Sequence, residues 1–282
     1  LLEYLAVARV GGATQVGKGV YTHFLDEKGG IRADLTIVRL SEDCFRVICG
    51  GGTGHRDLVW IKQMAAARHA DIEIHNRTHQ LATLGLWGPN ARKVLASLVD
   101  DPNAVSDAKF PFATAANIEI EGIKIWAFRI SYVGELGWEL YFDFADGLQL
   151  WDLFAAAGVN PVGIETYANS RRLEKSLRLQ NADLETDYNL HEADLARKLV
   201  KKADFHGKAA YVAQKAADQQ ASYLCTMVML KNVDASGVAR YPVGEWPILN
   251  KETREVLLDE LGRRSICTSV EYGPSLGSNI IL

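Results

Sequence analysis

Residues 131–142, SYVGELGWELYF, place the tightest local limit on the fold of this chain. From Gly137 onward the side chains alternate, with Trp138 on one face and Glu139 and Tyr141 on the other. This period of two predicts a β-strand with one buried face. The preceding Gly-Glu-Leu-Gly predicts a bend at which the backbone approaches another group closely. Glu139 is therefore either a solvated outward residue or a carboxylate that points into a pocket.

Similar patterns along the chain predict a mixture of strands and helices. Residues 20–49 predict a three-stranded meander, because short polar turns separate three strand-like runs. Residues 118–130 predict a hairpin around Glu121-Gly122, and residues 81–88 predict a further strand. Apolar spacing and end signals predict helices over 55–70, 88–99, 146–158 and about 164–178.

The last quarter of the chain has a different character. Short strand-like runs over 223–230, 255–260 and 264–269 predict a separate β-rich module. The polar, Ala- and Gln-rich stretch 214–222 predicts the boundary before it. The chain is therefore expected to divide into three parts, over 1–75, 76–218 and 219–282.

The composition is that of an ordinary globular protein and excludes several classes of function. Of the 282 residues 48% are hydrophobic and 23% are charged, and the net charge of −4 gives no reason to expect a nucleic acid or an anionic membrane as partner. No apolar run approaches the roughly 20 residues of a membrane span. The four cysteines form no CxxC pair and the seven histidines no HExxH motif, so we expect no metal site and a reducing compartment.

Six segments of the chain together resemble the glycine-cleavage T-protein family, the tetrahydrofolate-dependent aminomethyltransferases. The resemblance is closest to the folate-binding portion of dimethylglycine and sarcosine dehydrogenases and oxidases, where that portion follows a flavin domain. Relative to the family, an N-terminal portion is expected to be absent and the C-terminal module to be incomplete. The segments, in the order of the family, are YTHFLDEKGGIRADLTIVRL, LGLWGPNARKVL, ISYVGELGWELYF, GIETYANSRRLEK, HEADLARKLVKKADFHGKAAY and CTSVEYGPSLGSNI.

The resemblance implies a fold as well as an activity. The expected fold is α+β, a multidomain ring (cloverleaf) with a central hole through which tetrahydrofolate passes. Residues 1–75 would form the folate-binding α+β subdomain, residues 76–218 a second α+β subdomain, and residues 219–282 a small β-barrel module.

The resemblance also gives Glu139 a function. The pterin ring of tetrahydrofolate presents a ring N–H and an exocyclic NH₂ at one edge, and a carboxylate can accept both in a bidentate, charge-assisted pair. By resemblance Glu139 anchors the pterin, while Tyr21 and Tyr132 line the folate site. The alternative for both tyrosines is ordinary packing with the hydroxyl at the surface.

Asp34 interrupts an apolar strand in the run ADLTIV. A carboxylate at a strand start most often accepts a turn hydrogen bond or faces solvent. By resemblance Asp34 is the catalytic aspartate, and near folate N5 it could orient the amine, steer its proton or stabilise an iminium-like cation. Of the family's two acids before this strand only the second is present, because Ala33 precedes Asp34.

Arg172 lies in the helical run RRLEKSLR, for which a solvated helix with a Glu174–Arg178 pair is the simplest interpretation. By resemblance Arg172 is the arginine of the family's RLE motif and lies at the folate site, where it would suit the glutamate carboxylate of folate. The spacing leaves open whether Arg171 or Arg172 faces the ligand.

Two functions are therefore expected from the sequence. The first is a tetrahydrofolate-dependent aminomethyl or methyl transferase, stand-alone or as the folate module of a demethylating oxidoreductase. Its partners would be a small-molecule one-carbon donor and a flavin domain or carrier protein, in the cytoplasm or, in a eukaryote, the mitochondrial matrix. The second is a relative with the same fold that lacks catalysis and serves as an interaction or regulatory module.

Overall fold

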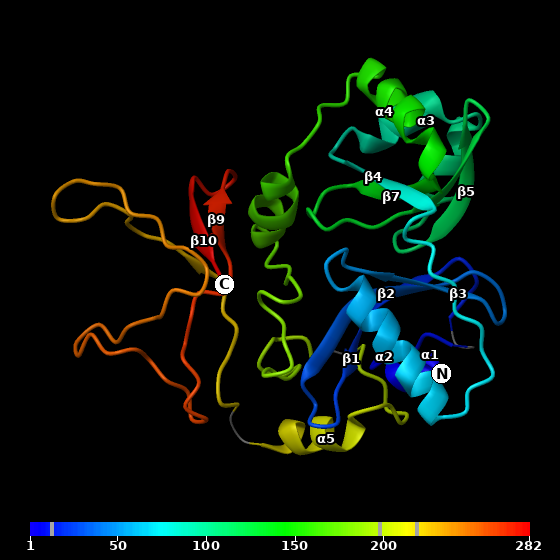
Figure 1. Ribbon diagram of the computed structural model, residues 1–282. Coiled ribbons are helices and arrows are strands. Elements are labelled where there is room, and N and C mark those ends of the chain that lie inside the picture. Colours follow the sequence, from blue (N-terminus) through cyan, green and yellow to red (C-terminus); the bar gives the residue numbers. More distant parts are fainter. Residues whose placement is uncertain (12–13, 197–198, 218–219) are drawn as a thin grey trace. The chain divides into compact units, whose positions relative to one another are not determined.

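The computed structural model of the chain describes residues 1–11, 14–196, 199–217 and 220–282, and Figure 1 labels its helices and strands. The three-part division of the chain stays a prediction, and its second boundary, at 218–219, lies outside the described residues. The described residues form two compact units. Unit 1 contains Leu1–Glu3, Arg9–Thr22 and Leu35–Val162, and unit 2 contains Tyr4–Ala8, His23–Asp34 and Gly163–Leu282.

The predicted meander is confirmed as a sheet with the order β1-β2-β3. Its strands are β1 (Gly19–Leu25), β2 (Ile31–Arg39) and β3 (Phe45–Cys49). Asp26 holds the turn between β1 and β2, because its Oδ1 accepts hydrogen bonds from the N–H groups of Lys28 (2.9 Å) and Gly30 (2.8 Å). A Cβ at Gly30 would lie 2.0 Å from the carbonyl oxygen of Thr186, so only glycine fits there. The hairpin that carries Asp34 is thus fixed at its turn.

Unit 1 contains a second, antiparallel sheet with the order β4-β7-β6-β5. The predicted hairpin over 118–130 and the strand that follows the glycine bend are both confirmed. One face of the sheet carries the core side chains, among them the fully buried Trp138 and Leu140, and the other carries Glu139 and Tyr141. The strands are β4 (Leu81–Trp87), β5 (Ala115–Ile120), β6 (Ile123–Phe128) and β7 (Gly137–Asp143).

The helices of unit 1 appear where the apolar spacing predicted them. Leu95 of α3 and Leu150 of α4 are fully buried in the same core as the inner face of the second sheet. Gly158, with a φ of 81°, follows the end of α4, as expected for a glycine at a helix C-terminus. The elements are α2 (Gly54–Ala67), α3 (Ala91–Leu98), α4 (Gly147–Ala156), the 3₁₀ turns η1 (Pro102–Val105) and η2 (Phe144–Asp146), and the short α1 (Leu2–Leu5), which begins in unit 1 and ends in unit 2.

Unit 2 has less regular structure than the sequence predicts (Figure 1). The helix expected over 164–178 is centred on a π-helical turn, and Ser176, with a φ of 55°, ends it early. Residues 255–260 and 264–269 form only isolated bridges, so the prediction of regular strands there is wrong. The elements are η3 (Thr166–Arg171), α5 (Lys208–Ala216) and the antiparallel sheet β8-β10-β9, with β8 (Met227–Val228), β9 (Val270–Gly273) and β10 (Ser278–Ile281). Residues 220–282 form no closed barrel, and the barrel stays a prediction.

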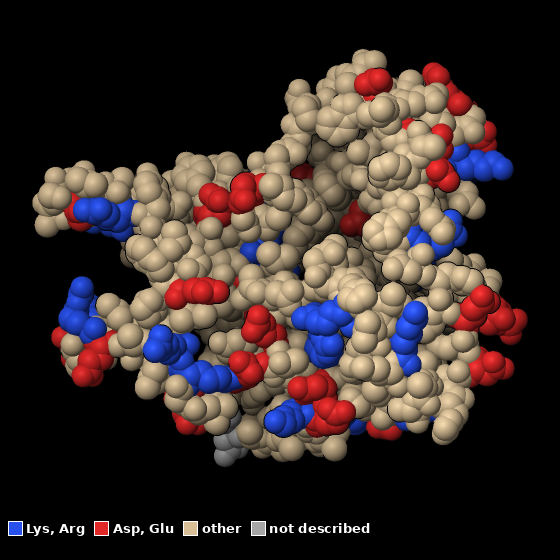
Figure 2. Space-filling model, in the orientation of Figure 1, with Lys and Arg blue, Asp and Glu red and all other residues tan. Residues whose placement is uncertain are grey.

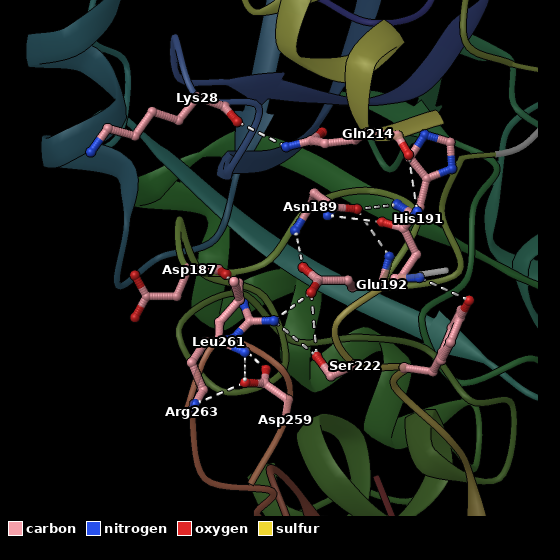
Figure 3. A network of polar contacts seen from close by, with 12 residues as sticks. Lys28, Asp187, Asn189, His191, Glu192, Gln214, Ser222, Asp259, Leu261 and Arg263 are labelled. Carbon is pink, nitrogen blue, oxygen red and sulfur yellow. Dashed lines mark hydrogen bonds and ion pairs between the residues drawn. The ribbon is translucent and has the colours of Figure 1, made fainter. Parts of the chain in front are cut away.

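A polar network joins distant segments of unit 2 (Figure 3). Arg263 donates from Nε to Asp259 (2.6 Å), and from Nη2 to Glu192 and to the hydroxyl of Ser222 (3.1 Å). Glu192 is buried, and its own N–H donates to Asn189 Oδ1 (3.0 Å). The network connects the segment around residue 190 to the loops at 222 and 259–263 without a regular sheet.

The segment 184–193 belongs to the core of unit 2. Leu184 and Leu190 are fully buried and pack with Leu25 and Ile31 of the β1–β2 hairpin. This segment therefore supports the hairpin that carries Asp34.

Candidate functional site

Glu139 lies on the outer face of the second sheet in unit 1. In the strand register it stands opposite Gly85 of β4 and Phe128 of β6. Its Oε2 accepts a hydrogen bond from the hydroxyl of Tyr141 at 2.5 Å. Burial raises the pKa of Glu139, and the Tyr141 hydrogen bond opposes that rise. The carboxylate is therefore a partly desolvated, oriented acceptor, in contrast to a solvated outward glutamate.

Trp87, which the sequence interpretation missed, occupies the space left by the glycines around Glu139. A Cβ at Gly85 would lie 1.9 Å from the Trp87 ring, and a Cβ at Gly137 would lie 2.1 Å from the carbonyl oxygen of Leu86. The indole N–H of Trp87 donates to the carbonyl of Ile130 (3.2 Å). The close approach predicted at the glycine bend is confirmed, and the approaching group is the β4 backbone with the Trp87 ring. The sequence signal was the GLWG run, in which a glycine two residues before a tryptophan lies on the same strand face.

The two candidate tyrosines both belong to unit 1. Tyr132 is half-buried in the loop that enters β7, where the Ser131 hydroxyl accepts hydrogen bonds from the N–H groups of Val133 (3.3 Å) and Glu135 (3.1 Å). Tyr21 lies on β1 and is 40% exposed. Both rings are accessible enough to contact a ligand, and their assignment to the folate site stays a prediction.

Asp34 lies beside His23, a second residue that the sequence interpretation missed. His23 on β1 places Nε2 3.8 Å from Asp34 Oδ1 on β2. The two side chains are 5% and 14% exposed, respectively. Burial lowers the pKa of His23 to about 4, so the imidazole is neutral at pH 7. Asp34 is thus a largely buried carboxylate with a neutral imidazole as neighbour, an arrangement suited to holding or moving a proton.

Arg172 has a different environment from the one its motif implies. Its side chain is 0% exposed, and so is that of Asp183, to which Nη1 donates at 2.5 Å. Its other short donations go to the Ser269 hydroxyl (2.6 Å) and to the carbonyls of Ala168 (2.7 Å) and Leu177 (3.0 Å). The guanidinium donates within unit 2, so a contact with a folate carboxylate stays a prediction that would require these bonds to be exchanged.

The neighbouring arginine is the more accessible of the two. Arg171 is 25% exposed and donates to Glu174 (2.7 Å). The Glu174–Arg178 pair of a solvated helix is absent from the described contacts, because Glu174 binds Arg171 and the N–H of Ser275 (2.6 Å), while Arg178 faces Asp194. Of the two candidates, Arg171 reaches the surface and Arg172 does not.

The described residues form no other obvious centre of chemistry. No cluster of three or more His, Cys, Asp or Glu in them could hold a metal ion. His75 and His79 are four residues apart in sequence but lie in an irregular segment, where His75 faces Glu73 (3.0 Å).

None of the described helices has the length and apolar composition to cross a membrane. Side chains of both signs are interspersed on the face drawn in Figure 2.

Comparisons with known proteins agree on one family. The model of the GCVT N-terminal domain matches residues 1–203. Dimethylglycine dehydrogenase, mitochondrial, of Homo sapiens is 39% identical over 229 residues, which cover 79% of this chain and 26% of that protein. Aminomethyltransferase of Listeria monocytogenes serotype 4a is 32% identical, over 94% of this chain and 67% of that protein. The chain thus spans about a quarter of the length of the dimethylglycine dehydrogenases it matches.

One solved structure shows the same fold. The glycine cleavage system aminomethyltransferase T from Bartonella henselae superimposes with a TM-score of 0.73 at 24% identity, and the match covers 99% of this chain and 71% of that one. The mixed α/β fold is therefore confirmed.

Proposed function

Because the chain belongs to the GCVT N-terminal domain family, we propose that it is a tetrahydrofolate-dependent one-carbon transferase of the aminomethyltransferase type. The observation that carries the proposal is the Asp34 carboxylate, held in a largely buried position 3.8 Å from the neutral imidazole of His23. A carboxylate in such a place can act on an amine proton or on a cationic carbon, both of which occur in one-carbon transfer between amines.

The residues around Glu139 fit the pterin part of the cosubstrate. The pterin edge offers two N–H donors, and a partly desolvated carboxylate oriented by Tyr141 offers two acceptor oxygens. Trp87 supplies an aromatic wall beside it. We assign Glu139 to binding and orientation, and Tyr21 and Tyr132 to the lining of the folate site.

Asp34 performs the chemical step in this proposal. Tetrahydrofolate, when bound, supplies the amine nitrogen that takes up the one-carbon unit. Asp34 accepts a hydrogen bond from that amine, turns its lone pair toward the carbon and stabilises positive charge on the carbon as the bond to the donor nitrogen breaks. The electron pair of that bond leaves with the donor nitrogen, which takes up the proton that the folate nitrogen would lose on forming its new bond to carbon. His23 remains neutral beside Asp34, 3.8 Å away.

The wider setting follows the family. We propose the ring arrangement with a C-terminal barrel for the whole protein and a small-molecule amine as the one-carbon donor. The match to dimethylglycine dehydrogenases supports a module in a longer demethylating enzyme with a flavin domain, and the match to aminomethyltransferases supports a stand-alone enzyme or one served by a carrier protein. Arg172 stays in this proposal as a residue of the folate site, where its buried contact with Asp183 would be exchanged for one with a folate carboxylate.

Two variants test the proposal, and they should separate binding from chemistry. Asp34→Asn should lower turnover of a one-carbon donor with tetrahydrofolate by roughly 10²–10⁴-fold, the usual range for a positioned acid–base group, and leave folate affinity almost unchanged. Glu139→Gln should weaken tetrahydrofolate binding in calorimetry by about 2–4 kcal/mol, because it places an NH₂ group where an acceptor is needed.

Matched controls come from exposed acids in unit 1. Asp71→Asn and Glu42→Gln make the same changes of charge at exposed positions and should alter neither quantity. If the chain binds no tetrahydrofolate, the proposal fails. If the Asp34→Asn variant turns over at the parental rate, Asp34 is a structural residue, and the result supports the alternative of a relative without catalysis.

A further inference from the structure

A groove along the second sheet shares Tyr141 with the proposed pterin position, and its other lining residues have no role in the function proposed above. It lies within unit 1 and has a volume of about 730 Å³, within the range of about 300–1,000 Å³ that is typical of small-molecule sites. Its aromatic side chains are Trp126 of β6 and Tyr141 of β7, which stand opposite each other in the strand register with ring centroids 5.2 Å apart. Asp143, four residues beyond Glu139 along β7, also lines the groove.

Arg46 of β3 lies over these rings. Its Cζ is 4.0 Å from the centroid of the Trp126 ring and 5.7 Å from that of Tyr141. Its Nη1 is buried and has no hydrogen-bond acceptor in the described part of the chain. A buried charged donor without an acceptor costs free energy. A ligand that brings an anionic or carbonyl oxygen into the groove would remove that cost. A guanidinium is planar, so its N–H groups lie in one plane, the geometry that a carboxylate matches.

The charges around the groove favour an anion near Arg46. Arg77 lines the same groove. Burial lowers the pKa of Arg46, Tyr141 opposes that shift, and Arg77 adds to it. Two acids of the rim have donors of their own. Asp101 accepts from the N–H of Asn103 (2.9 Å), and Asp143 accepts from the N–H of Ala145 (3.0 Å).

Two other rim charges stand opposite each other, and Asp100 is a further acid of the rim. Glu119 stands opposite Lys124 in the β5–β6 register, a cross-strand position at which opposite charges attract. Within the described part of the chain, Nη1 of Arg46 is the buried cationic donor of this groove that has no acceptor.

We propose that this groove binds a small organic carboxylate whose oxygens take the N–H groups of Arg46 and whose flat apolar part packs against Trp126 and Tyr141. Arg77 adds a second positive charge at the same end of the groove. The site differs from the pterin position in its anchoring residue, which is a cation here and a carboxylate at Glu139. The proposal does not depend on folate binding, so it can fail or succeed separately from the proposed function.

Benzoate is a suitable probe, with benzyl alcohol as a neutral ligand of the same size. The chain itself should bind benzoate in calorimetry, more weakly as salt is raised, and should bind benzyl alcohol at least tenfold more weakly. The fluorescence of Trp126 should change on binding, and Trp126→Phe should remove that change. Equal affinity for the two ligands, or an affinity for neither, overturns the proposal.

Variants of the arginine locate the site. Arg46→Gln should weaken benzoate binding by about 10–100-fold, the loss expected for one charge-assisted contact. Arg46→Lys should lose less, because it keeps the charge but not the planar fork. Lys93→Gln, at an exposed position of α3, makes the same charge change and should have no effect.

Two outcomes would contradict the assignment. Unchanged benzoate affinity in Arg46→Gln shows that the anion binds elsewhere. Displacement of benzoate by tetrahydrofolate, lost in Glu139→Gln, makes the groove part of the folate site and overturns its separate status. If Arg46→Gln does not fold, the comparison of benzoate with benzyl alcohol on the parent chain decides.

Discussion

The replacement Asp183→Asn should destabilise unit 2 strongly, because it removes the only charge that compensates Arg172 among the contacts described for that guanidinium. Both side chains are 0% exposed. Asp183 accepts hydrogen bonds from the Thr268 hydroxyl (2.5 Å) and the Ser269 hydroxyl (2.7 Å) as well as from Arg172 (2.5 Å). Asparagine has nearly the same shape, so the change removes charge and an acceptor without opening a cavity.

The expected cost follows from this geometry. Removing one partner of a buried ion pair leaves the other charge uncompensated and costs about 3–5 kcal/mol. Since a whole domain is stable by only about 5–15 kcal/mol, the loss should be at least about a fifth of the total. Replacing both residues with apolar ones, as in Arg172→Met with Asp183→Leu, should cost less than Asp183→Asn alone, because no charge is then left buried.

Urea unfolding followed by circular dichroism measures the effect as a lower midpoint. Asp234→Asn is the matched control, because the partner of Asp234, Arg240, is largely exposed and a surface ion pair contributes little. A loss below about 1 kcal/mol in Asp183→Asn, on the scale of a surface pair, would refute the reasoning. It would mean that Arg172 is not held as a buried charge, and the assignment of Arg172 to a folate carboxylate would regain support.

Local patterns were enough to predict much of unit 1. The alternation after Gly137 predicted β7, and the Glu121-Gly122 pair predicted the hairpin, since both residues have positive φ values of 48° and 78°. In these segments the side chains that decide the structure are neighbours in sequence. The strands therefore form where the local pattern predicts them.

The same reasoning predicted unit 2 poorly, because the structure of unit 2 depends on contacts between residues far apart in the sequence. Arg263 reaches Glu192, 71 positions away, and Arg172 reaches Ser269, 97 positions away. Short β-branched runs such as 264–269 looked like strands, but polar contacts and isolated bridges hold them instead. A sequence period cannot reveal a partner that lies so far along the chain.

Local sequence also predicted some residues of the candidate site and missed others. Glu139 stood out beside the glycine bend and Asp34 because it interrupts an apolar strand, and the resemblance gave each its expected role. The structure places each in a partly or largely buried position. His23 and Trp87 were missed because their neighbours are defined by strand pairing. A histidine in a strand and a tryptophan after a glycine read as ordinary packing until the register is known.

Two further predictions follow from buried positions in the two units. Gly137→Ala should cost about 1–3 kcal/mol in the same urea assay, because its Cβ would lie 2.1 Å from the backbone oxygen of Leu86, whereas Gly52→Ala, with no atom within 4 Å, should change little. His23 should make the folded state sensitive to acid, because burial lowers its pKa from 6.5 to about 4 and the unfolded chain therefore binds the proton more readily. A folded pKa below the unfolded one means that stability is fully present above about pH 6.5 and is lost as the pH falls toward 4. The 2.5 units between the two values correspond to about 3 kcal/mol at 1.36 kcal/mol per unit. His23→Gln does not titrate, so the loss of stability between pH 7 and pH 4 should be smaller than in the parent by about that amount. Urea unfolding at pH 7, 5.5 and 4.5 tests this. If the free energies of unfolding of the two proteins fall in parallel with pH, His23 takes up its proton as readily in the folded as in the unfolded chain. That result would contradict a neutral imidazole beside Asp34.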